Sequence, residues 1–225
     1  MAKNKTNTPK DERYSLKGSS FWGILIFAVL LIVDLVTKWL ADAYFSSPDT
    51  PNKIDIIPGW IWLEIEYNPG ISYGMGANAP EWVKLLVVIA TAGIMLALAI
   101  FYFKMDKRRT LLRLAFVFIV AGGVGNLIDR VYYRVWELDA YANVGVRDMV
   151  NLSRFGFAVC NFADFFITGG AVMMVLALLF FDRDAMYPVG AKYRALAKEY
   201  QAEEEAKKKA QTQENQTTAD EKNNG

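Results

Sequence analysis

The sequence predicts an all-α membrane protein, a bundle of four transmembrane helices with a small extracytoplasmic β element. Hydrophobic residues make up 53% of the 225 residues, and they gather in long blocks rather than recurring at helix or strand period. Four blocks approach the roughly 20 apolar residues that a helix needs to cross a bilayer. Two of the connections between them are far longer than the usual ~2 to 8 residues of a helical bundle. These two connections are therefore expected to carry structure of their own.

The four predicted spans cover about residues 20–45, 82–103, 111–128 and 162–181. The first follows a basic N-terminal segment, as the apolar core of a signal peptide would. No small-residue cleavage site follows that core; instead Asp34, Lys38 and Trp39 come next. The first block is therefore interpreted as a retained helix.

Lysine and arginine near the helix ends predict the orientation, because cytoplasmic connections are enriched in these residues. They precede the first span, fill the connection between the second and third, and follow the fourth. The first long connection holds only Lys53, although the other long connection is richer in arginine. Both termini are therefore expected in the cytoplasm, in a multi-pass membrane protein.

The chain divides into a cytoplasmic tail (1–19), the membrane domain (20–181) with outer loops at about 46–81 and 129–161, and a cytoplasmic tail (182–225). In the first loop, residues 60–67 alternate bulky apolar and acidic side chains, as a half-buried strand does. A turn at Asn68-Pro69-Gly70 and a glycine-rich run to Gly76 follow, which permit close backbone approach to a ligand. In the second tail, a short helix through 203–209 is expected before a disordered end rich in Gln, Asn and Thr.

Composition excludes several function classes. A net charge of +1, with basic residues in scattered short clusters, gives no electrostatic case for binding nucleic acid. The single Cys160 cannot form an internal disulfide. Because the chain has no histidine, Ser-His and Cys-His nucleophile pairs and His-ligated metal sites are excluded. Acid-base chemistry must come from carboxylates, lysine or tyrosine.

Polar residues inside or next to the spans form three clusters, and the topology brings them together. Asp34 lies on the order of 20 Å along the first helix, at 1.5 Å per residue, which places it in the outer half of the bilayer. The third helix delivers the second cluster to the same face, and the fourth helix begins there with the third cluster. Ionisable groups are costly in the membrane and usually functional. The clusters consist of Asp34 and Lys38, of Asn126, Asp129 and Arg130, and of Asp148, Asn161 and Asp164.

In this order the clusters resemble the bacterial lipoprotein signal peptidases, also called signal peptidase II. The resemblance extends from the first predicted helix to the fourth. Five motifs carry it, namely Asp34-Leu-Val-Thr-Lys38, Asn68-Pro-Gly70 with Tyr73 and Gly74 nearby, Gly122-Gly-Val-Gly125-Asn126-Leu-Ile-Asp129-Arg130, Val146-Arg-Asp148, and Asn161-Phe-Ala163-Asp164. Two positions depart from the family pattern, since Cys160 and Met149 stand where the family has Phe.

The resemblance implies an aspartic endopeptidase of the bacterial inner membrane that removes the signal peptide from diacylglyceryl-modified prolipoproteins, cleaving before the lipidated cysteine. Its catalytic pair maps onto Asp148 and Asp164, and no metal or organic cofactor is required. Lipid-modified prolipoproteins and membrane lipid are the implied partners, nucleic acid is not, and a monomer is expected. Substrate-binding or supporting roles fall to Asn68, Gly70, Asn126, Asp129, Arg130, Asn161, Ala163, Asp34 and Lys38.

Two carboxylates held close cannot both ionise easily, so one keeps a proton and the pair acts as acid and base together. We expect Asp164 to be the ionised member, because a helix N-terminus favours negative charge. A structural alternative stands beside each assignment. Asp148 and Asp164 would then be helix caps or loop braces, Arg130 and Asn68 loop ties, and Asp129 a brace at the end of its helix. Asp34 and Lys38 are four residues apart and favour a simple ion pair.

A competing function is a small proton or cation transporter with Asp34, Asp129 and Asp164 along its path. It predicts carboxylates spread through the membrane depth, whereas the topology gathers them at one face. A purely structural bundle gives no reason for Asn126, Arg130 and Asn161. A presenilin-like protease requires Gly-x-Gly-Asp, and here Asn126 occupies the aspartate position.

Overall fold

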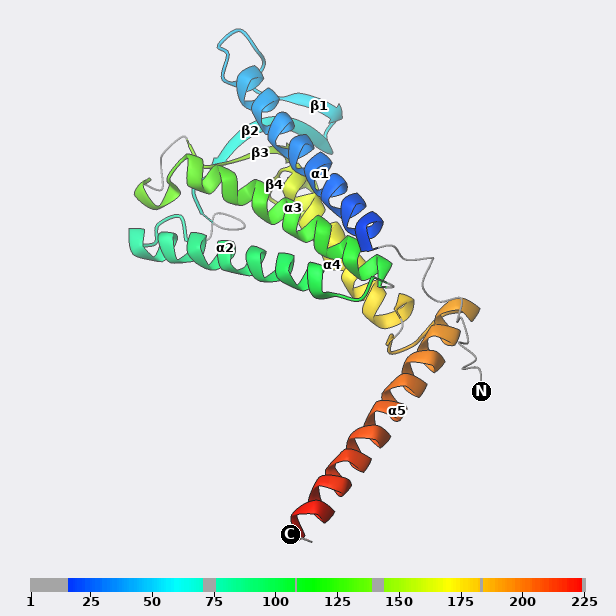
Figure 1. Cartoon of the computed structure of the whole chain (residues 1–225). Helices are drawn as coiled ribbons and strands as arrows, with labels where there is room; N and C mark the ends of the chain where they lie inside the picture. The colour runs from blue at the N-terminus through cyan, green and yellow to red at the C-terminus, as the bar shows by residue number, and fades with distance from the viewer. Residues whose placement is uncertain (1–15, 71–75, 108, 139–143, 183, 224–225) are drawn as a thin grey trace.

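The computed structural model describes residues 16–70, 76–107, 109–138, 144–182 and 184–223 (Figure 1). Its main helices are α1 (Leu16–Phe45), α2 (Glu81–Lys104), α3 (Thr110–Tyr132), α4 (Phe162–Leu176) and α5 (Gly190–Asn223), and a π-helical turn, η4 (Ala177–Phe181), prolongs α4. Four segments are long and apolar enough to cross a membrane: Ser20–Phe45, Glu81–Lys104, Thr110–Tyr132 and Phe162–Phe181. The four predicted spans are confirmed, although the third continues past its predicted end near residue 128. Asp129 and Arg130 therefore lie within α3 rather than in the loop after it.

Helix α3 is the centre of the bundle and packs against α1, α2 and α4. Small residues make this possible, because they let helix backbones approach closely where lipid supplies no hydrophobic driving force. A Cβ atom added to Gly122 would lie 2.3 Å from the carbonyl oxygen of Ala163 on α4. Ala115 and Ala121 of α3 are fully buried. The α3–α4 pair is thus the tightest contact through which the spans hold together.

A small antiparallel sheet lies at the end of the bundle where α4 begins (Figure 1). Its strands are β1 (Ile54–Ile57), β2 (Ile61–Asn68), β3 (Val146–Asn151) and β4 (Val159–Cys160), in spatial order β1-β2-β3-β4. The alternation in residues 60–67 correctly predicts β2. Strands β3 and β4, in the second long connection, have no such alternation and were not expected. Short 3-10 turns, η2 (Val135–Glu137) and η3 (Ser153–Phe155), complete this connection.

The C-terminal segment differs from expectation. One 34-residue helix, α5, replaces the short helix expected through 203–209, and it extends over the Gln, Asn and Thr-rich part that was expected to be disordered. Alanine, glutamate, lysine and glutamine all favour helix, and Lys207 pairs with Glu204 at 3.2 Å. Figure 1 shows α5 extending away from the bundle, from the end opposite the sheet.

Several expectations lie outside the described residues. They include the middle of the glycine-rich run, with Tyr73 and Gly74, and most of the N-terminal tail. The division of the chain into two tails and one membrane domain stays a prediction.

Two neighbouring glycines of α4 allow a matched test of the close α3–α4 contact. A Cβ atom at Gly170 would lie 2.7 Å from Ile119 Cγ1 and 2.9 Å from the Ala115 oxygen, whereas one at Gly169 would meet nothing within 4 Å. Gly170→Ala should therefore lower the free energy of unfolding by about 1 to 3 kcal/mol, and Gly169→Ala should leave it unchanged or slightly raised. Thermal unfolding in detergent measures both, and equal effects would contradict the packing.

Candidate active site

The ammonium group of Lys38 is a fully enclosed charge inside the bundle. Lys38 is fully buried on α1, and its Nζ lies 2.8 Å from Asp34 Oδ2, 2.9 Å from Asn126 Oδ1 and 3.5 Å from Asp129 Oδ2. The expected i, i+4 ion pair with Asp34 is confirmed, but it is only part of the arrangement. Because the other two partners belong to α3, one charge fixes how α1 and α3 lie against each other.

Asp34 connects this ion pair to α4. Its Oδ1 accepts a 2.9 Å hydrogen bond from the backbone N–H of Ala163, in the first turn of α4. A Cβ atom at Gly125 would lie 2.3 Å from Asp34 Oδ2, so only glycine leaves room for the carboxylate here. Gly125 and Ala163 are therefore small because Asp34 needs close approach to two other helices.

Two asparagines link the buried charges to the predicted catalytic pair. Asn126 accepts from Lys38 through Oδ1 and donates through Nδ2 to Asp164 Oδ1, at 2.9 Å. The Nδ2 group of Asn161 donates to Asn126 Oδ1 at 3.0 Å and to Asp148 Oδ1 at 2.6 Å. Asn161 thus contacts Asp148 with its side chain and Asp164 with its backbone N–H.

Asp164 and Asn161 cap the start of α4 for each other. The Asn161 side chain accepts from the Asp164 backbone N–H at 3.1 Å, and Asp164 Oδ2 accepts from the Asn161 backbone N–H at 3.0 Å. This reciprocal arrangement is a capping box, which satisfies two helix N–H groups. The expected capping role of Asp164 is thus present, and it places the same carboxylate at the positive end of the helix dipole.

Asp148 reaches the site from the sheet. It lies on β3 opposite Glu66 of β2, and Asn68 at the end of β2 donates from Nδ2 to Asp148 Oδ2 at 3.4 Å. The predicted turn after Asn68 is present, because Asn68 Oδ1 accepts from the Gly70 backbone N–H at 2.9 Å. Pairing of β2 with β3 therefore brings residues 80 positions apart into one site.

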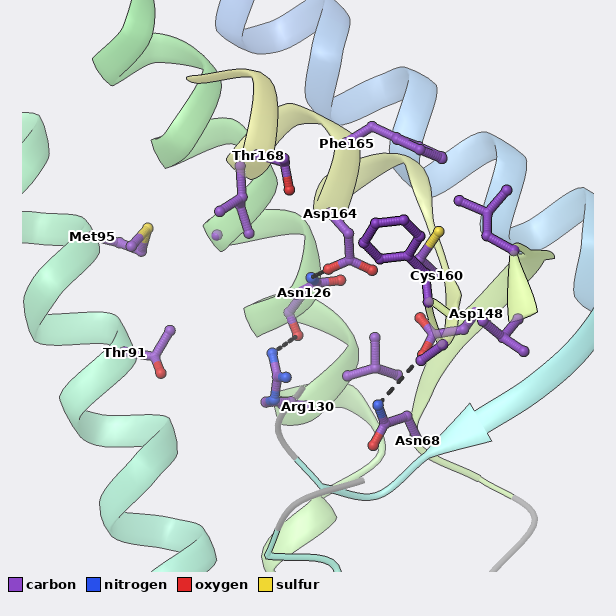
Figure 2. A pocket seen from close by; sticks show the side chains of 17 residues that line it. Asn68, Thr91, Met95, Asn126, Arg130, Asp148, Cys160, Asp164, Phe165 and Thr168 are labelled. Carbon is purple, nitrogen blue, oxygen red and sulfur yellow. Dashed lines mark hydrogen bonds between the residues drawn. The ribbon is translucent and has the colours of Figure 1, made fainter. Parts of the chain in front are cut away.

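Asp148 and Asp164 line the same cavity of about 570 Å³ (Figure 2). Asn68, Asn126 and Arg130 also line it, and Figure 2 shows these three side chains gathered around the two carboxylates. Most of the remaining wall is apolar and comes from α2, α4 and the second connection, namely Met95, Val146, Leu152, Phe157, Ala158, Val159, Phe165 and Ile167. The cavity combines a long apolar surface with one polar corner.

Burial and the neighbouring charge of Asp164 raise the pKa of Asp148 to about 7, against hydrogen bonds from Asn68 and Asn161 that lower it. Near neutral pH this carboxyl therefore carries a proton for much of the time. Burial, with the two carboxylates nearby, also raises the pKa of the Cys160 thiol to about 12. Cys160, which stands where the family has Phe, is half-buried and lines the cavity.

Arg147 ties the start of β3 to α3 and α1. The sequence patterns do not identify it as a site residue. Its Nη2 donates to Asp129 Oδ1 at 2.6 Å and its backbone N–H to Asp129 Oδ2 at 3.1 Å, and its guanidinium lies 3.7 Å from Asp42 Oδ2 of α1. Tyr67 of β2 donates to the other oxygen of Asp42 at 2.5 Å. Asp129 therefore braces the end of α3, as expected, and does so by binding the residue before Asp148.

Five of the predicted site residues line the cavity, and the other six lie behind it. These six residues do not line the cavity but support it, namely Lys38, Asp34, Asp129, Asn161, Ala163 and Gly70. Arg130 lines it, and its Nη1 donates to the Asn126 carbonyl at 3.3 Å. Within the described part of the chain, no group of three or more His, Cys, Asp or Glu side chains is placed to hold a metal ion.

The fold and the site define a multi-pass membrane protein with two carboxylates, the buried Asp148 and the half-buried Asp164, in a largely apolar cavity at one end of its bundle. A family model described as signal peptidase (SPase) II matches residues 26–180. The chain belongs to this family and is therefore a membrane peptidase. The transporter alternative finds no support here.

Individual relatives agree with this assignment. The chain is 32% identical over 168 residues to the lipoprotein signal peptidase of Fusobacterium nucleatum, covering 74% of this chain and 91% of the relative. It is 36% identical over 154 residues to that of Bifidobacterium longum subsp. infantis, covering 68% and 76%. A bacterial membrane enzyme solved by the in meso method at 2.3 Å is 26% identical, with a TM-score of 0.57, covering 71% of this chain and 88% of that one.

The raised pKa of Asp148 predicts how stability changes with pH. The unfolded chain loses this proton near pH 3.9, whereas the folded protein keeps it to about pH 7. Stability therefore falls as pH rises across this window, and Asp148→Asn removes the fall. The free energy of unfolding of the variant, relative to that of the parent, should rise between about pH 4 and 7. Above pH 7 this difference should stay constant.

Thermal unfolding at a series of pH values measures this difference. Asp55→Asn, at a solvent-exposed carboxylate of β1, is the control and should show no such trend. A difference between Asp148→Asn and the parent that is the same at every pH would show that the Asp148 proton is not retained on folding.

Proposed function

We propose that the protein is an aspartic endopeptidase in which Asp148 and Asp164 are the catalytic pair. The observation that carries the proposal is the Asn161 bridge, which contacts both carboxylates at the polar corner of one cavity. Carboxylates this close favour a shared proton. Such a pair supplies an acid and a base to one reaction.

Each member of the pair has its own role. Asp164 lies at a helix N-terminus and accepts hydrogen bonds from Asn126 and from the Asn161 backbone, which favour the ionised form. Asp148, with its pKa raised to about 7, is the protonated member. These contacts support Asp164 as the base and Asp148 as the acid.

The reaction is hydrolysis of one peptide bond. Asp164 takes a proton from water as the water oxygen attacks the scissile carbonyl carbon, while Asp148 donates its proton toward the carbonyl oxygen. When the tetrahedral intermediate collapses, the C–N bond breaks and the leaving amine takes a proton from the pair. Asn68 and Arg130, at the rim of the pair, bind backbone carbonyls of the substrate. Water is the only second reactant.

The proposed substrates are prolipoproteins carrying a diacylglyceryl-modified cysteine, cleaved just before that cysteine to release the signal peptide. The names of the relatives support this substrate class. The apolar walls of the cavity suit a lipid-modified chain that arrives from the membrane. Basic residues near the helix ends support cytoplasmic termini and an extracytoplasmic site. A monomer suffices, because one chain supplies the whole pair.

Cleavage of a lipid-modified prolipoprotein by the purified protein tests the proposal. Asp148→Asn and Asp164→Asn should each lower kcat by at least about 10³-fold, because neither variant retains an acid and a base. Asp55→Asn should keep the parental rate. The unfolding measurement on the same samples separates lost chemistry from lost folding. Near-parental cleavage by either folded site variant would refute the assignment.

A further inference from the structure

A second cavity of about 460 Å³ lies between α1, α2 and α3 and takes no part in the proposed chemistry. Its walls are apolar along their length and include Gly23, Phe27, Ala99, Phe116 and Leu127. All of them belong to segments that can span the membrane. The cavity, here called the α1–α2 groove, therefore opens into the hydrocarbon of the bilayer rather than into water.

An aromatic ring closes one end of the groove, and a buried cation lies over the face of this ring. Tyr102 lines the groove and faces Gly23 of α1. The Arg113 guanidinium lies 4.2 Å from the centre of the Tyr102 ring, and Phe116 and Val117, one turn further along α3, are also groove residues. Arg113 is only 4% exposed. A positive charge is thus enclosed next to a groove that has no charged residue in its wall.

The hydrogen-bonding capacity of Arg113 is only partly used. Its Nη1 donates to the carbonyl oxygens of Tyr102 and Met105, at 2.9 and 3.0 Å, where α2 ends. Among the residues that the structure describes, its buried Nη2 has no hydrogen-bond partner, and neither has the buried Nζ of Lys107. A buried charged donor without an acceptor is costly, so a ligand that supplies oxygens would be favoured here.

The other charged groups nearby do not cancel this positive end. Arg109 is engaged by Asp182 and Asp184 at 2.7 and 2.5 Å. Along the sequence, the α2–α3 connection contains one acidic residue, Asp106, and the flanking helix ends add the basic residues Lys104 and Arg113 to Lys107. The local balance is therefore cationic at the end of an apolar groove.

We propose that the α1–α2 groove binds an anionic phospholipid of the surrounding membrane, with an acyl chain in the groove and the phosphate at Arg113 and Lys107. An acyl chain matches the apolar walls, and phosphate oxygens match the donors that guanidinium and ammonium groups present. Basic pockets between transmembrane helices recognise anionic lipid headgroups in this way. The bound lipid fills the space between α1 and α2, which otherwise contact each other little.

The geometry favours a resident lipid over the acyl chain of a substrate. Arg113 precedes Asn126 by 13 residues on α3, which places the cationic end about 20 Å from the carboxylates along the helix axis. Met95 lines both cavities and lies against Gly123, so its side chain forms a wall between them. A chain attached to a substrate at Asp148 and Asp164 would have to pass this wall.

Native mass spectrometry of the full-length protein tests the proposal. The protein is reconstituted in bilayers of equal parts phosphatidylglycerol and phosphatidylcholine, extracted, and weighed with its retained lipid. Retained phosphatidylglycerol should exceed phosphatidylcholine by at least about fivefold, as expected when cations contact the headgroup. Ala99→Phe, which fills the groove, should lower retention about tenfold, and Lys107→Gln should reduce the preference for phosphatidylglycerol.

Ala97→Phe is the matched control, because Ala97 lies on the same helix, is exposed and does not line the groove. It should retain lipid like the parent. Equal retention of the two lipids, or equal loss in Ala97→Phe and Ala99→Phe, would overturn the proposal. Photolabelling of residues 92–103 by a substrate whose acyl chain carries a diazirine would also overturn it, by assigning the groove to the substrate. The catalytic pair is not involved, so these outcomes are independent of the proposed chemistry.

Discussion

The buried ammonium of Lys38 is the interaction on which the rest of the site depends. It is fully enclosed and lies within 2.8 to 3.5 Å of an oxygen from each of Asp34, Asn126 and Asp129. A charge in the membrane interior is stable only when its partners are fixed around it. Here those partners come from α1 and α3, and Asp34 adds α4 by binding the N–H of Ala163. One cation thereby sets the relative positions of three helices.

The distribution of charges explains why only one pair of acids is left available for chemistry. Lys38 is engaged by Asp34 and Asp129, and Arg147 is bound by Asp129 and Asp42, so these three carboxylates serve as structural partners of two cations. Among the residues that the structure describes, the donors to Asp148 are the side-chain amides of Asn68 and Asn161. Without a cation in direct contact, burial and a neighbouring carboxylate raise its pKa to about 7. Lys38 and Arg147 thus stabilise the packing of the helices and the sheet, while Asp148 keeps a proton in the cavity.

Sequence patterns predict the parts of this arrangement that depend on local order along the chain. Apolar blocks give the four spans, and the i, i+4 spacing gives the Asp34–Lys38 pair. The pairing of β2 with β3 depends on residues about 80 positions apart, and β3 lacks the apolar–polar alternation that predicts a strand locally. In the sequence, Arg147 looks like any other basic residue of a loop. Its position directly before Asp148 is the signal that could identify it as part of the site. Charge pairs predict only the 203–209 part of α5, whereas the helix extends from Gly190 to Asn223 because most of its residues favour helix.

The free energy of unfolding of Lys38→Met tests the central claim most directly, with Thr37→Val as the control. Thr37 is next in sequence, and its hydroxyl binds only carbonyls of its own helix. Removing the ammonium leaves Asp34 and Asp129 buried without it, so Lys38→Met should lose about 3 to 5 kcal/mol. Thr37→Val should stay close to the parent. If Lys38→Met unfolds no more easily than Thr37→Val, the buried ammonium does not hold the helices together.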